Sequence, residues 1–332
     1  MAESYRIFGV EMSPYSVKVR SYFRYKGIPH EWVVRGIKEM PEFQKYAKLP
    51  LVPLVVSGTG EAMQDSTPII ETFEKKYPDP SITPSDPTLA FLSALIEEYA
   101  DEWGNKPMFH YRWTYEADQK SGAERIFLEN MPGAAGAALD QGRQMIMQRM
   151  VPRLKFVGSN PVTLPMIEDS FKRTCRILER HLSGRDFLMG GRPVMADFGL
   201  YAQIYECSTD PTPGVWMKAN APQTLAWIQR MLSPRATGEL ETPKALEPTL
   251  EPLLREEIGA LFLPWSAANA KAVAAGSKEF SMELAGKPWV QEPQKYAAKS
   301  LGVIRQKYQM TAGKDLLDPL LERTGCLPWL KG

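Results

Sequence analysis

The sequence contains few cysteines, no excess of one charge and no long apolar run. Its three cysteines, Cys175, Cys207 and Cys326, lie far apart in 332 residues, which argues against a disulfide framework. Lysine and arginine number 40 against 39 aspartates and glutamates, so the formal net charge of +1 favours a small-molecule or protein partner over nucleic acid. No apolar stretch approaches the roughly 18 residues of a transmembrane helix, and no apolar leader opens the sequence. We therefore expect a cytoplasmic protein that neither binds nor crosses a membrane.

Common catalytic motifs are missing as well. There is no GxSxG nucleophile elbow, no GxxxxGK(S/T) phosphate loop and no dinucleotide fingerprint between a strand and a helix. The three histidines, His30, His110 and His181, have no partners at metal-ligand spacing. These absences disfavour a serine hydrolase, a nucleotide-dependent enzyme and a metal enzyme.

The first 80 residues predict the element order β-α-β-α-β-β-α. An apolar strand at 5–10 precedes Ser13, which stands at the N-cap of a helix with Pro14 in its first position. A second strand, in "HEWVVRG", and a short polar helix follow. Two β-rich runs joined by "SGTG" then predict an antiparallel hairpin, and a last helix begins at "DST" and ends before Pro78.

A proline-rich stretch at 79–88 separates this unit from a second one with a different pattern. From Leu89 onward apolar residues recur at helical spacing, with no competing strand alternation, so the second unit is predicted to be all-helical. Within it, "GRPVMADFGLYAQ" predicts a helix start at which Asp197, alone or with water, bonds backbone N–H groups, because Val194 has no side-chain acceptor. The last hundred residues give short helical stretches without a clear place in either unit.

The N-terminal pattern resembles the thioredoxin-like domain of cytosolic glutathione transferases. Three features carry the resemblance: the element order, a proline after Val52 at the start of the third strand, and an Asp65–Ser66 pair at the next helix. The helical continuation matches more loosely, and the "SPY" element is also similar to glutathione-dependent β-etherases, which cleave aryl ethers. The resemblance implies an α/β thioredoxin-like, glutathione-binding domain at 1–80, a linker at 81–88, an all-α substrate domain at 89–232 and an extension at 233–332 packed on the helical domain.

The resemblance also implies which residues bind glutathione. It gives Ser13 the position that activates the thiol, Val52 and Pro53 the cis-proline loop that pairs with the cysteinyl backbone, and Gln64, Asp65 and Ser66 the segment that holds the γ-glutamyl end. A free thiol has a pKa of about 8.5, so a transferase must stabilise the thiolate at neutral pH. One charge-assisted hydrogen bond of roughly 1.5 to 3 kcal/mol exceeds the roughly 1.4 kcal/mol that lowers a pKa by one unit, so a hydroxyl at a helix N-terminus suffices. A cysteine at position 13 would instead favour disulfide exchange.

Each of these assignments has a structural alternative. Ser13 alone could be an ordinary N-cap, and the proline and Asp-Ser elements could be an edge-strand proline and a helix cap; their joint order favours glutathione binding. Tyr5 and Tyr15 are rival activators of the thiol. For the glycyl carboxylate of glutathione we prefer Lys48 over Lys38, although a solvated helix face explains both.

The segment "KPMFHYRW" predicts part of the co-substrate pocket. We place Tyr15, Phe109, His110 and Trp113 there. An aromatic stripe at helical spacing is also typical of an ordinary core, so both interpretations stay open.

These features together predict a glutathione transferase in which glutathione is the co-substrate and no metal takes part. Ser13 activates the glutathione thiolate for attack on an apolar or aromatic electrophile, and the resemblance implies a homodimer and a role in detoxification. A β-etherase is the narrower alternative. A noncatalytic binding or scaffold protein, in which Ser13 only caps its helix, is the alternative from another class, and a disulfide reductase would need a resident cysteine.

Overall fold

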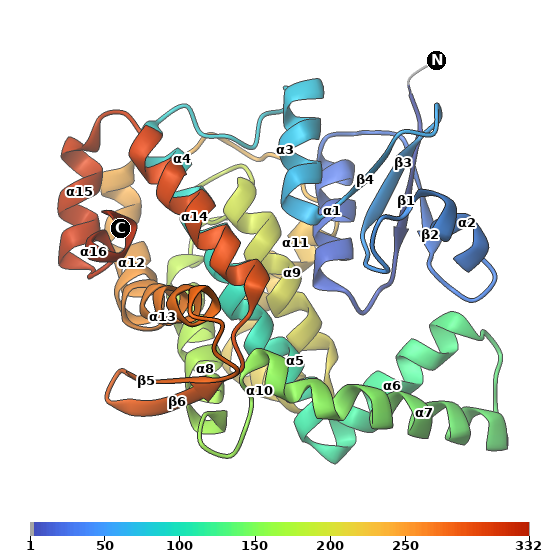
Figure 1. Cartoon of the computed structure of the whole chain (residues 1–332). Helices are drawn as coiled ribbons and strands as arrows, with labels where there is room; N and C mark the ends of the chain where they lie inside the picture. The colour runs from blue at the N-terminus through green and yellow to red at the C-terminus, as the bar shows by residue number, and fades with distance from the viewer. Residues whose placement is uncertain (1–2, 332) are drawn as a thin grey trace.

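The N-terminal domain is built on a four-stranded sheet in the computed structural model, which describes residues 3–331 (Figure 1). The strands lie in the order β2-β1-β3-β4, in which β1 pairs in parallel with β2 and antiparallel with β3. β3 and β4 form the predicted antiparallel hairpin. The strands span Tyr5–Gly9 (β1), His30–Val34 (β2), Leu54–Ser57 (β3) and Ala62–Gln64 (β4).

Helices cover both faces of this sheet, with α1 and α3 together on one side and α2 on the other (Figure 1). They span Pro14–Tyr25 (α1), Met40–Tyr46 (α2) and Ser66–Lys76 (α3). Successive strand residues face opposite sides of a sheet, so Ile7 joins the core on the α1 side while Phe8 packs with Phe43 of α2. The predicted element order is confirmed.

Local sequence signals set both ends of α1. The Ser13 Oγ accepts a hydrogen bond from the Ser16 N–H at 3.3 Å, and Pro14 occupies the first turn. Gly27 ends the helix with a φ of +63°, a conformation that a residue without a Cβ adopts at no steric cost. Ser13 therefore stands at the positive end of the α1 dipole.

A nearly continuous helical rod opens the second domain. It changes from α-helix to π-helix at Ala100–Gly104 (η1) and back again. The helices of this domain span Pro87–Tyr99 (α4), Asn105–Thr114 (α5), Glu116–Asn130 (α6), Gly136–Met150 (α7), Val151–Val157 (η2), Leu164–His181 (α8), Met195–Thr209 (α9), Pro211–Asn220 (α10) and Pro222–Leu232 (α11). The predicted fold class, a thioredoxin-like domain followed by an all-α domain, is confirmed. The chain between α3 and α4 covers 77–86, where the sequence predicts a linker at 81–88.

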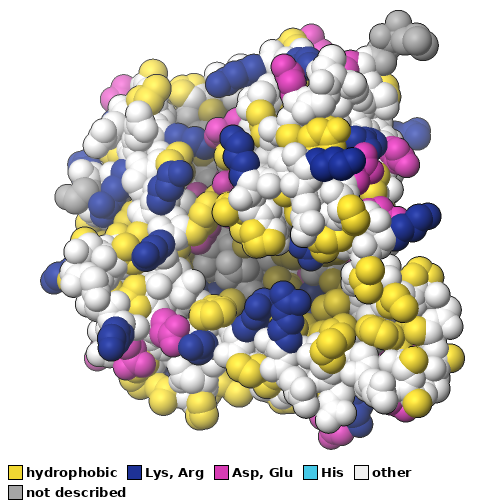
Figure 2. Space-filling view, turned by 45° about the vertical axis from the view of Figure 1, so that its right-hand side comes forward, with side chains coloured by type: hydrophobic (Ala, Val, Ile, Leu, Met, Phe, Trp, Pro, Cys, Tyr) yellow, Lys and Arg dark blue, Asp and Glu magenta, His cyan; other side chains and the backbone are white. Residues whose placement is uncertain are grey.

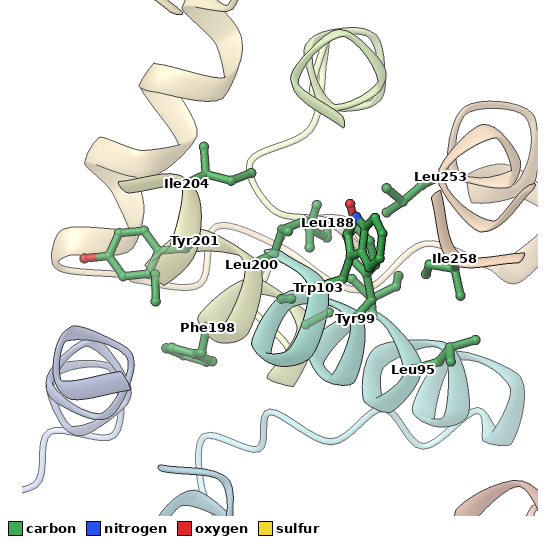
Figure 3. Packing of buried hydrophobic residues seen from close by; sticks show 14 of the residues in the cluster. Leu95, Tyr99, Trp103, Leu188, Phe198, Leu200, Tyr201, Ile204, Leu253 and Ile258 are labelled. Carbon is green, nitrogen blue, oxygen red and sulfur yellow. The ribbon is translucent and has the colours of Figure 1, made fainter. Parts of the chain in front are cut away.

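The centre of the helical domain is an apolar core around α4, η1 and α9 (Figure 3). The buried side chains include Leu95, Tyr99 and Trp103 from α4 and η1, Phe198, Leu200, Tyr201 and Ile204 from α9, and Leu253 and Ile258 from the C-terminal extension. The removal of this apolar surface from water stabilises the domain, and the extension shares in it.

The start of α9 follows the prediction for Asp197. Its Oδ2 accepts from the Val194 N–H at 3.0 Å, and its Oδ1 accepts from the Leu188 N–H and the Trp227 indole N–H, both at 2.9 Å. Val194 contributes no side-chain acceptor, so Asp197 alone satisfies these buried donors.

Residues 233–331 form an extension that lies along one side of the helical domain, in orange and red in Figure 1. α12 packs on α8, and α14 and α15 pack on α4. The extension also reaches the N-terminal domain, where Lys307 of α14 pairs with Glu71 of α3 at 2.6 Å. Its elements span Pro243–Leu253 (α12), Leu254–Phe262 (η3), Leu263–Ala274 (α13), Phe280–Leu284 (β5), Lys287–Gln291 (β6), Lys295–Met310 (α14), Lys314–Arg323 (α15) and Leu327–Lys331 (α16). The β5–β6 hairpin was not predicted, and the outer limits of the predicted ranges 1–80 and 233–332 lie outside the described residues.

Two further features concern the described part of the chain as a whole. None of its helices combines the length and the apolar character that a bilayer span requires. The three cysteines are buried as free thiols.

Candidate functional site

A cavity of about 740 Å³ lies between the N-terminal domain and the rest of the chain. One wall comes from the loop before β3, from β4 and from the start of α3. The opposite wall comes from η1, α5 and η2 and from the extension, which contributes Trp265, Gln294 and Tyr296. The space-filling view shows a hollow near the centre of one face of the molecule, with hydrophobic and basic side chains gathered at its edge (Figure 2). All three parts of the chain therefore line the cavity.

The N-terminal wall contains all six predicted glutathione-binding residues. Val52 and Pro53 line the cavity, and the peptide bond between them is cis, as the resemblance implies. Asp65 and Ser66 line it at the junction of β4 and α3. Asp65 has a φ of +80°, a conformation that is rare for a residue with a Cβ and that clusters at functional sites. Its Oδ2 accepts a hydrogen bond of 2.7 Å from the Tyr296 hydroxyl, so the extension contacts this end of the cavity directly.

Gln64 also lines the cavity, but its side-chain amide is fully used within the N-terminal wall. The Oε1 atom accepts from the N–H groups of Lys48 at 2.8 Å and Leu49 at 3.1 Å, and Nε2 donates to the carbonyls of Leu49 at 2.9 Å and Leu51 at 2.8 Å. Gln64 therefore fixes the loop 48–51, and its amide has no hydrogen bond left for the predicted contact with a γ-glutamyl group. The exposed Lys48 lies on this loop and lines the cavity.

Ser13 is not among the residues within 3–331 that line the cavity. Its half-buried hydroxyl caps α1, so the N-cap interpretation is confirmed, while activation of a thiol stays a prediction. The residue before it is held firmly, because the Arg112 Nη1 donates to the Met12 carbonyl at 3.1 Å. Arg112 is itself buried and pairs with Glu206 at 2.7 Å and Asp210 at 2.9 Å. The backbone that carries Ser13 is thus anchored to α5 and α9.

Tyr15 is the one predicted pocket residue that lines the cavity. Its hydroxyl donates to the Asp101 carbonyl at 3.0 Å and accepts from the Asn105 Nδ2 at 3.3 Å. Burial, with the nearby Asp101 carboxylate, raises the pKa of Tyr15 well above its usual value, so this hydroxyl is a poor proton donor whose proton is already engaged. Tyr5, the other rival activator, is buried in the N-terminal core and bonds Tyr77 at 2.9 Å.

The three other predicted pocket residues belong to the core of the helical domain. His110 and Trp113 are almost fully buried, and the His110 Nδ1 bonds the Ser159 hydroxyl at 2.8 Å. Phe109 is half-buried and packs against Trp113. Among residues 3–331, none of these three lines the cavity. The structure brings Tyr15 to the cavity and assigns the aromatic stripe to packing, which was the alternative interpretation.

The helical wall carries three ionisable residues that the sequence interpretation missed: Asp101, Glu102 and Lys106. Lys18 of α1 is buried between Asp101, at 2.7 Å, and Glu97. Burial raises the pKa of Asp101 to about 6 even though Lys18 opposes the change. Burial also raises the pKa of Glu102 well above its usual value and lowers the pKa of Lys106 to about 7. The only sequence signal for this wall is the acidic run "EEYADEW" followed by "GNK".

A metal ion has no prepared position in the described residues. Within residues 3–331, no group of three or more histidine, cysteine, aspartate or glutamate side chains is arranged to hold one. The polar groups of the cavity instead suit an organic ligand with both a cationic and an anionic end, because carboxylates, lysines and a helix start face the same space.

Two sequence profiles of protein domains match this chain. Residues 7–81 match the glutathione S-transferase N-terminal domain, and residues 137–230 match the glutathione S-transferase C-terminal domain. Both the sheet domain and the helical domain are therefore covered by profiles of one family, in the chain order that the structure shows.

Individual proteins are similar to this chain at low identity. The isoprene-epoxide–glutathione S-transferase of a Rhodococcus species is 24% identical over 220 residues, which are 64% of this chain and 87% of that protein. Glutathione S-transferase omega-1 of Mus musculus is 28% identical over 83 residues, which are 25% of this chain and 35% of that protein. Among solved structures, a β-etherase from a Sphingobium species has a TM-score of 0.48 at 20% identity and covers 76% of this chain and 99% of its own. A glutathione S-transferase from Methylobacterium radiotolerans, in complex with glutathione sulfonate, has a TM-score of 0.43 at 19% identity. The match covers 72% of this chain and 99% of that protein's chain.

Proposed function

The chain belongs to the glutathione S-transferase family, and from that premise we propose that it binds glutathione in the cavity between its domains and activates the tripeptide's thiol for attack on an apolar or aromatic electrophile. The observation that carries this proposal is the cavity itself. Val52, Pro53, Asp65 and Ser66 converge on one wall, and a wall with apolar and ionisable groups faces them.

The charges of the cavity suit the two ends of glutathione. The first N–H groups of α3, which begins at Ser66, bind the γ-glutamyl carboxylate, as helix N-termini bind anions in general. Asp65 pairs with the γ-glutamyl ammonium, and Asp101 on the opposite wall adds a second carboxylate whose Oδ1 is buried without a partner among the described residues. Lys48 lies exposed on the N-terminal wall, where its ammonium can pair with the glycyl carboxylate.

Ser13 is proposed as the group that stabilises the thiolate. It stands at the N-cap of α1, beside the cavity lining, which includes Tyr15 two residues further on but not Ser13 itself. Its capping role is compatible with this. The cap uses a lone pair of Oγ, because the hydroxyl accepts from the Ser16 N–H. The hydroxyl proton therefore stays free to be donated to sulfur. The α1 dipole adds a partial positive charge at the same place.

The electrophile is proposed to be apolar or aromatic because Phe156, Val157 and Trp265 line the helical wall beside the ionisable groups. Two narrower substrate classes are aryl ethers, suggested by the "SPY" element, and epoxides, suggested by the name of the Rhodococcus relative. We also propose that the protein is a cytoplasmic homodimer with a role in detoxification, as the family resemblance implies.

The test compares Ser13→Ala with two matched variants. Ser13→Thr keeps the hydroxyl and the cap, and Ser16→Ala removes a buried hydroxyl of the same helix that has no hydrogen-bond partner among residues 3–331. We expect Ser13→Ala to raise the pKa of the bound thiol by about 1 to 2, since a charge-assisted hydrogen bond contributes roughly 1.5 to 3 kcal/mol, and to slow conjugation at neutral pH about ten- to hundredfold. Ser13→Thr and Ser16→Ala should stay near the original rate.

The readouts are glutathione binding by calorimetry, the ultraviolet absorbance of the bound thiolate against pH, and the rate of conjugation. If Ser13→Ala retains both the absorbance of the bound thiolate and the rate of conjugation, Ser13 does not activate the thiol. An original chain that binds glutathione without turning over any electrophile favours the noncatalytic binding protein, and loss of activity on replacing a cysteine favours a disulfide reductase.

A further inference from the structure

Two ionisable side chains of the helical wall have no role in the binding of glutathione described above. Glu102 of η1 and Lys106 of α5 stand one helical turn apart, and both line the cavity. They are only 8% and 2% exposed. Burying such groups costs free energy unless they are paired. Their position on a cavity wall therefore suits a small molecule whose polar groups pair with them when it binds in the cavity.

Lys106 sits in a cage of three tryptophans. Its Nζ lies 3.7 Å from the centre of the Trp265 ring, 5.4 Å from that of Trp103 and 5.6 Å from that of Trp289. The cage fixes the position of the amine, because cation–π contacts hold an ammonium over the ring faces. Two of the three rings belong to the extension, so the extension builds this part of the site.

The polar partners of Lys106 are already shared. Its Nζ lies 3.3 Å from the Gln291 Oε1, which also accepts from the indole N–H groups of Trp265 at 3.0 Å and Trp289 at 3.2 Å. A second contact, to the Val157 carbonyl, is long at 3.5 Å. One oxygen that serves three donors leaves hydrogen-bonding capacity on the amine, and the residue lines the cavity.

The Glu102 side chain has no hydrogen bond or ion pair with any group among residues 3–331, and Lys106 acts on it only through its charge. Burial, reinforced by Glu98 and Asp101, raises the pKa of Glu102 well above its usual value, so this carboxyl holds its proton to a higher pH than a solvated glutamate does. A buried, unpaired carboxyl with a raised pKa on a cavity wall is suited to donate its proton to a molecule in the cavity. The π-helical turn that carries it is a feature that recurs at functional sites.

We propose that Glu102 and Lys106 form a catalytic pair that binds and protonates an oxygen atom of the electrophile, so that the cavity takes electrophiles whose carbon–oxygen bond is broken, such as epoxides. The inference rests on the proposed function, because glutathione supplies the attacking sulfur. Lys106 donates a hydrogen bond to the oxygen and Glu102 gives it a proton.

The step balances without any further reactant. The thiolate sulfur gives an electron pair to carbon, the carbon–oxygen bond breaks with its pair on oxygen, and oxygen takes the proton of Glu102. The proton that glutathione released on forming the thiolate returns to Glu102 through water. The sum is thiol plus epoxide giving a hydroxy thioether.

The leaving atom decides whether such a pair is useful. An alkoxide is a strong base and leaves slowly unless it is protonated, whereas a halide is a weak base and leaves without a proton. The pair therefore accelerates epoxide opening, whereas halide displacement needs no proton from it. This difference separates a catalytic role from a structural one.

The experiment measures conjugation of glutathione with styrene oxide and with benzyl chloride, two apolar aromatic electrophiles of similar size. We expect Glu102→Gln, which keeps the shape and removes the acid, to lower kcat for styrene oxide about a hundredfold and to leave kcat for benzyl chloride within about threefold. Lys106→Met should lower the styrene oxide rate about tenfold, since it removes a single hydrogen-bond donor to the developing charge. Thermal unfolding of each variant, followed by circular dichroism, checks that it folds.

Glu31→Gln is the matched control. It makes the same change of side chain at an exposed position of β2, and within residues 3–331 Glu31 is not a cavity-lining residue. Both rates should therefore be unchanged in this variant.

Three results overturn the inference. If Glu102→Gln slows the conjugation of both electrophiles equally, or of neither, Glu102 is not the acid. An original chain that conjugates benzyl chloride but not styrene oxide shows that the site does not serve oxygen electrophiles, and the proposed function survives. If the original chain does not bind glutathione, both proposals are wrong. The failure of this inference alone is therefore distinguishable from the failure of the proposed function.

Discussion

Gln64 offers the sharpest test of how the N-terminal wall of the cavity is held. Its amide makes four hydrogen bonds to the loop 48–51, with distances between 2.8 and 3.1 Å. A family-based assignment gives it direct contact with glutathione, whereas the structure uses both ends of the amide within the protein. Replacing Gln64 by Ala and by Glu separates the two roles.

The magnitude follows from the hydrogen bonds. Each neutral hydrogen bond contributes roughly 0.5 to 1.5 kcal/mol. Because the loop is partly exposed, water replaces part of the lost bonds, so the variant should lose about 2 kcal/mol of the free energy that stabilises the ordered loop. Glutathione must then order the loop on binding. A cost of about 2 kcal/mol weakens the dissociation constant about thirtyfold.

Gln64→Glu decides between the interpretations. The carboxylate keeps one oxygen for the two N–H donors but turns the other toward the carbonyl oxygens of Leu49 and Leu51, so we expect it to bind glutathione no better than Gln64→Ala. A direct contact with the γ-glutamyl ammonium predicts the opposite, since a carboxylate pairs with an ammonium more strongly than an amide does.

The assay is calorimetric titration with glutathione, supported by amide hydrogen exchange across the loop. Exchange at 48–51 should speed up in both variants, and Gln44→Ala, a change at an exposed position of α2, should alter neither readout. Tight binding by Gln64→Glu, or an unchanged exchange rate in Gln64→Ala, refutes the reasoning.

Two further predictions concern stability. Asp197→Ala leaves the three buried donors of Leu188, Val194 and Trp227 without an acceptor, so urea unfolding should show a loss of at least about 3 kcal/mol; an unchanged midpoint contradicts this. Burial lowers the pKa of His181 from 6.5 to about 4, so its neutral ring stabilises the fold above pH 6.5 and that contribution is lost as the pH falls from 6.5 through 4. Between about pH 7.5 and 4.5 the original chain should lose roughly 2 to 3 kcal/mol more than His181→Gln, and equal losses argue against a buried neutral ring.

The N-terminal domain was predictable because its signals are local. Ser13 and Pro14 mark the start of α1, "SGTG" marks a hairpin turn, and Asp65–Ser66 marks the start of α3. The β5–β6 hairpin lacked such a signal. Its turn places Ala285 at a φ of +47° before Gly286, and alanine is not a residue that sequence rules associate with that conformation.

The helical wall of the cavity was predicted too far along α5 for a physical reason. Residues spaced by four and seven positions lie on one face of an α-helix, so Lys106, His110 and Trp113 share a face of α5. Lys106 stands in the first turn, where this face lines the cavity, while His110 and Trp113 lie one and two turns further on and are buried in the core. The other half of that wall comes from Trp265 and Tyr296, whose approach depends on packing between distant segments that no local pattern records.

The contact between Asp65 and Tyr296 joins positions 231 residues apart. A ribosome therefore has to synthesise another 231 residues after Asp65 before the enclosed site can form. During translation, a nascent chain that has already folded its sheet and its first helices still has this region open to water. Premature termination anywhere before Tyr296 leaves a product without that contact.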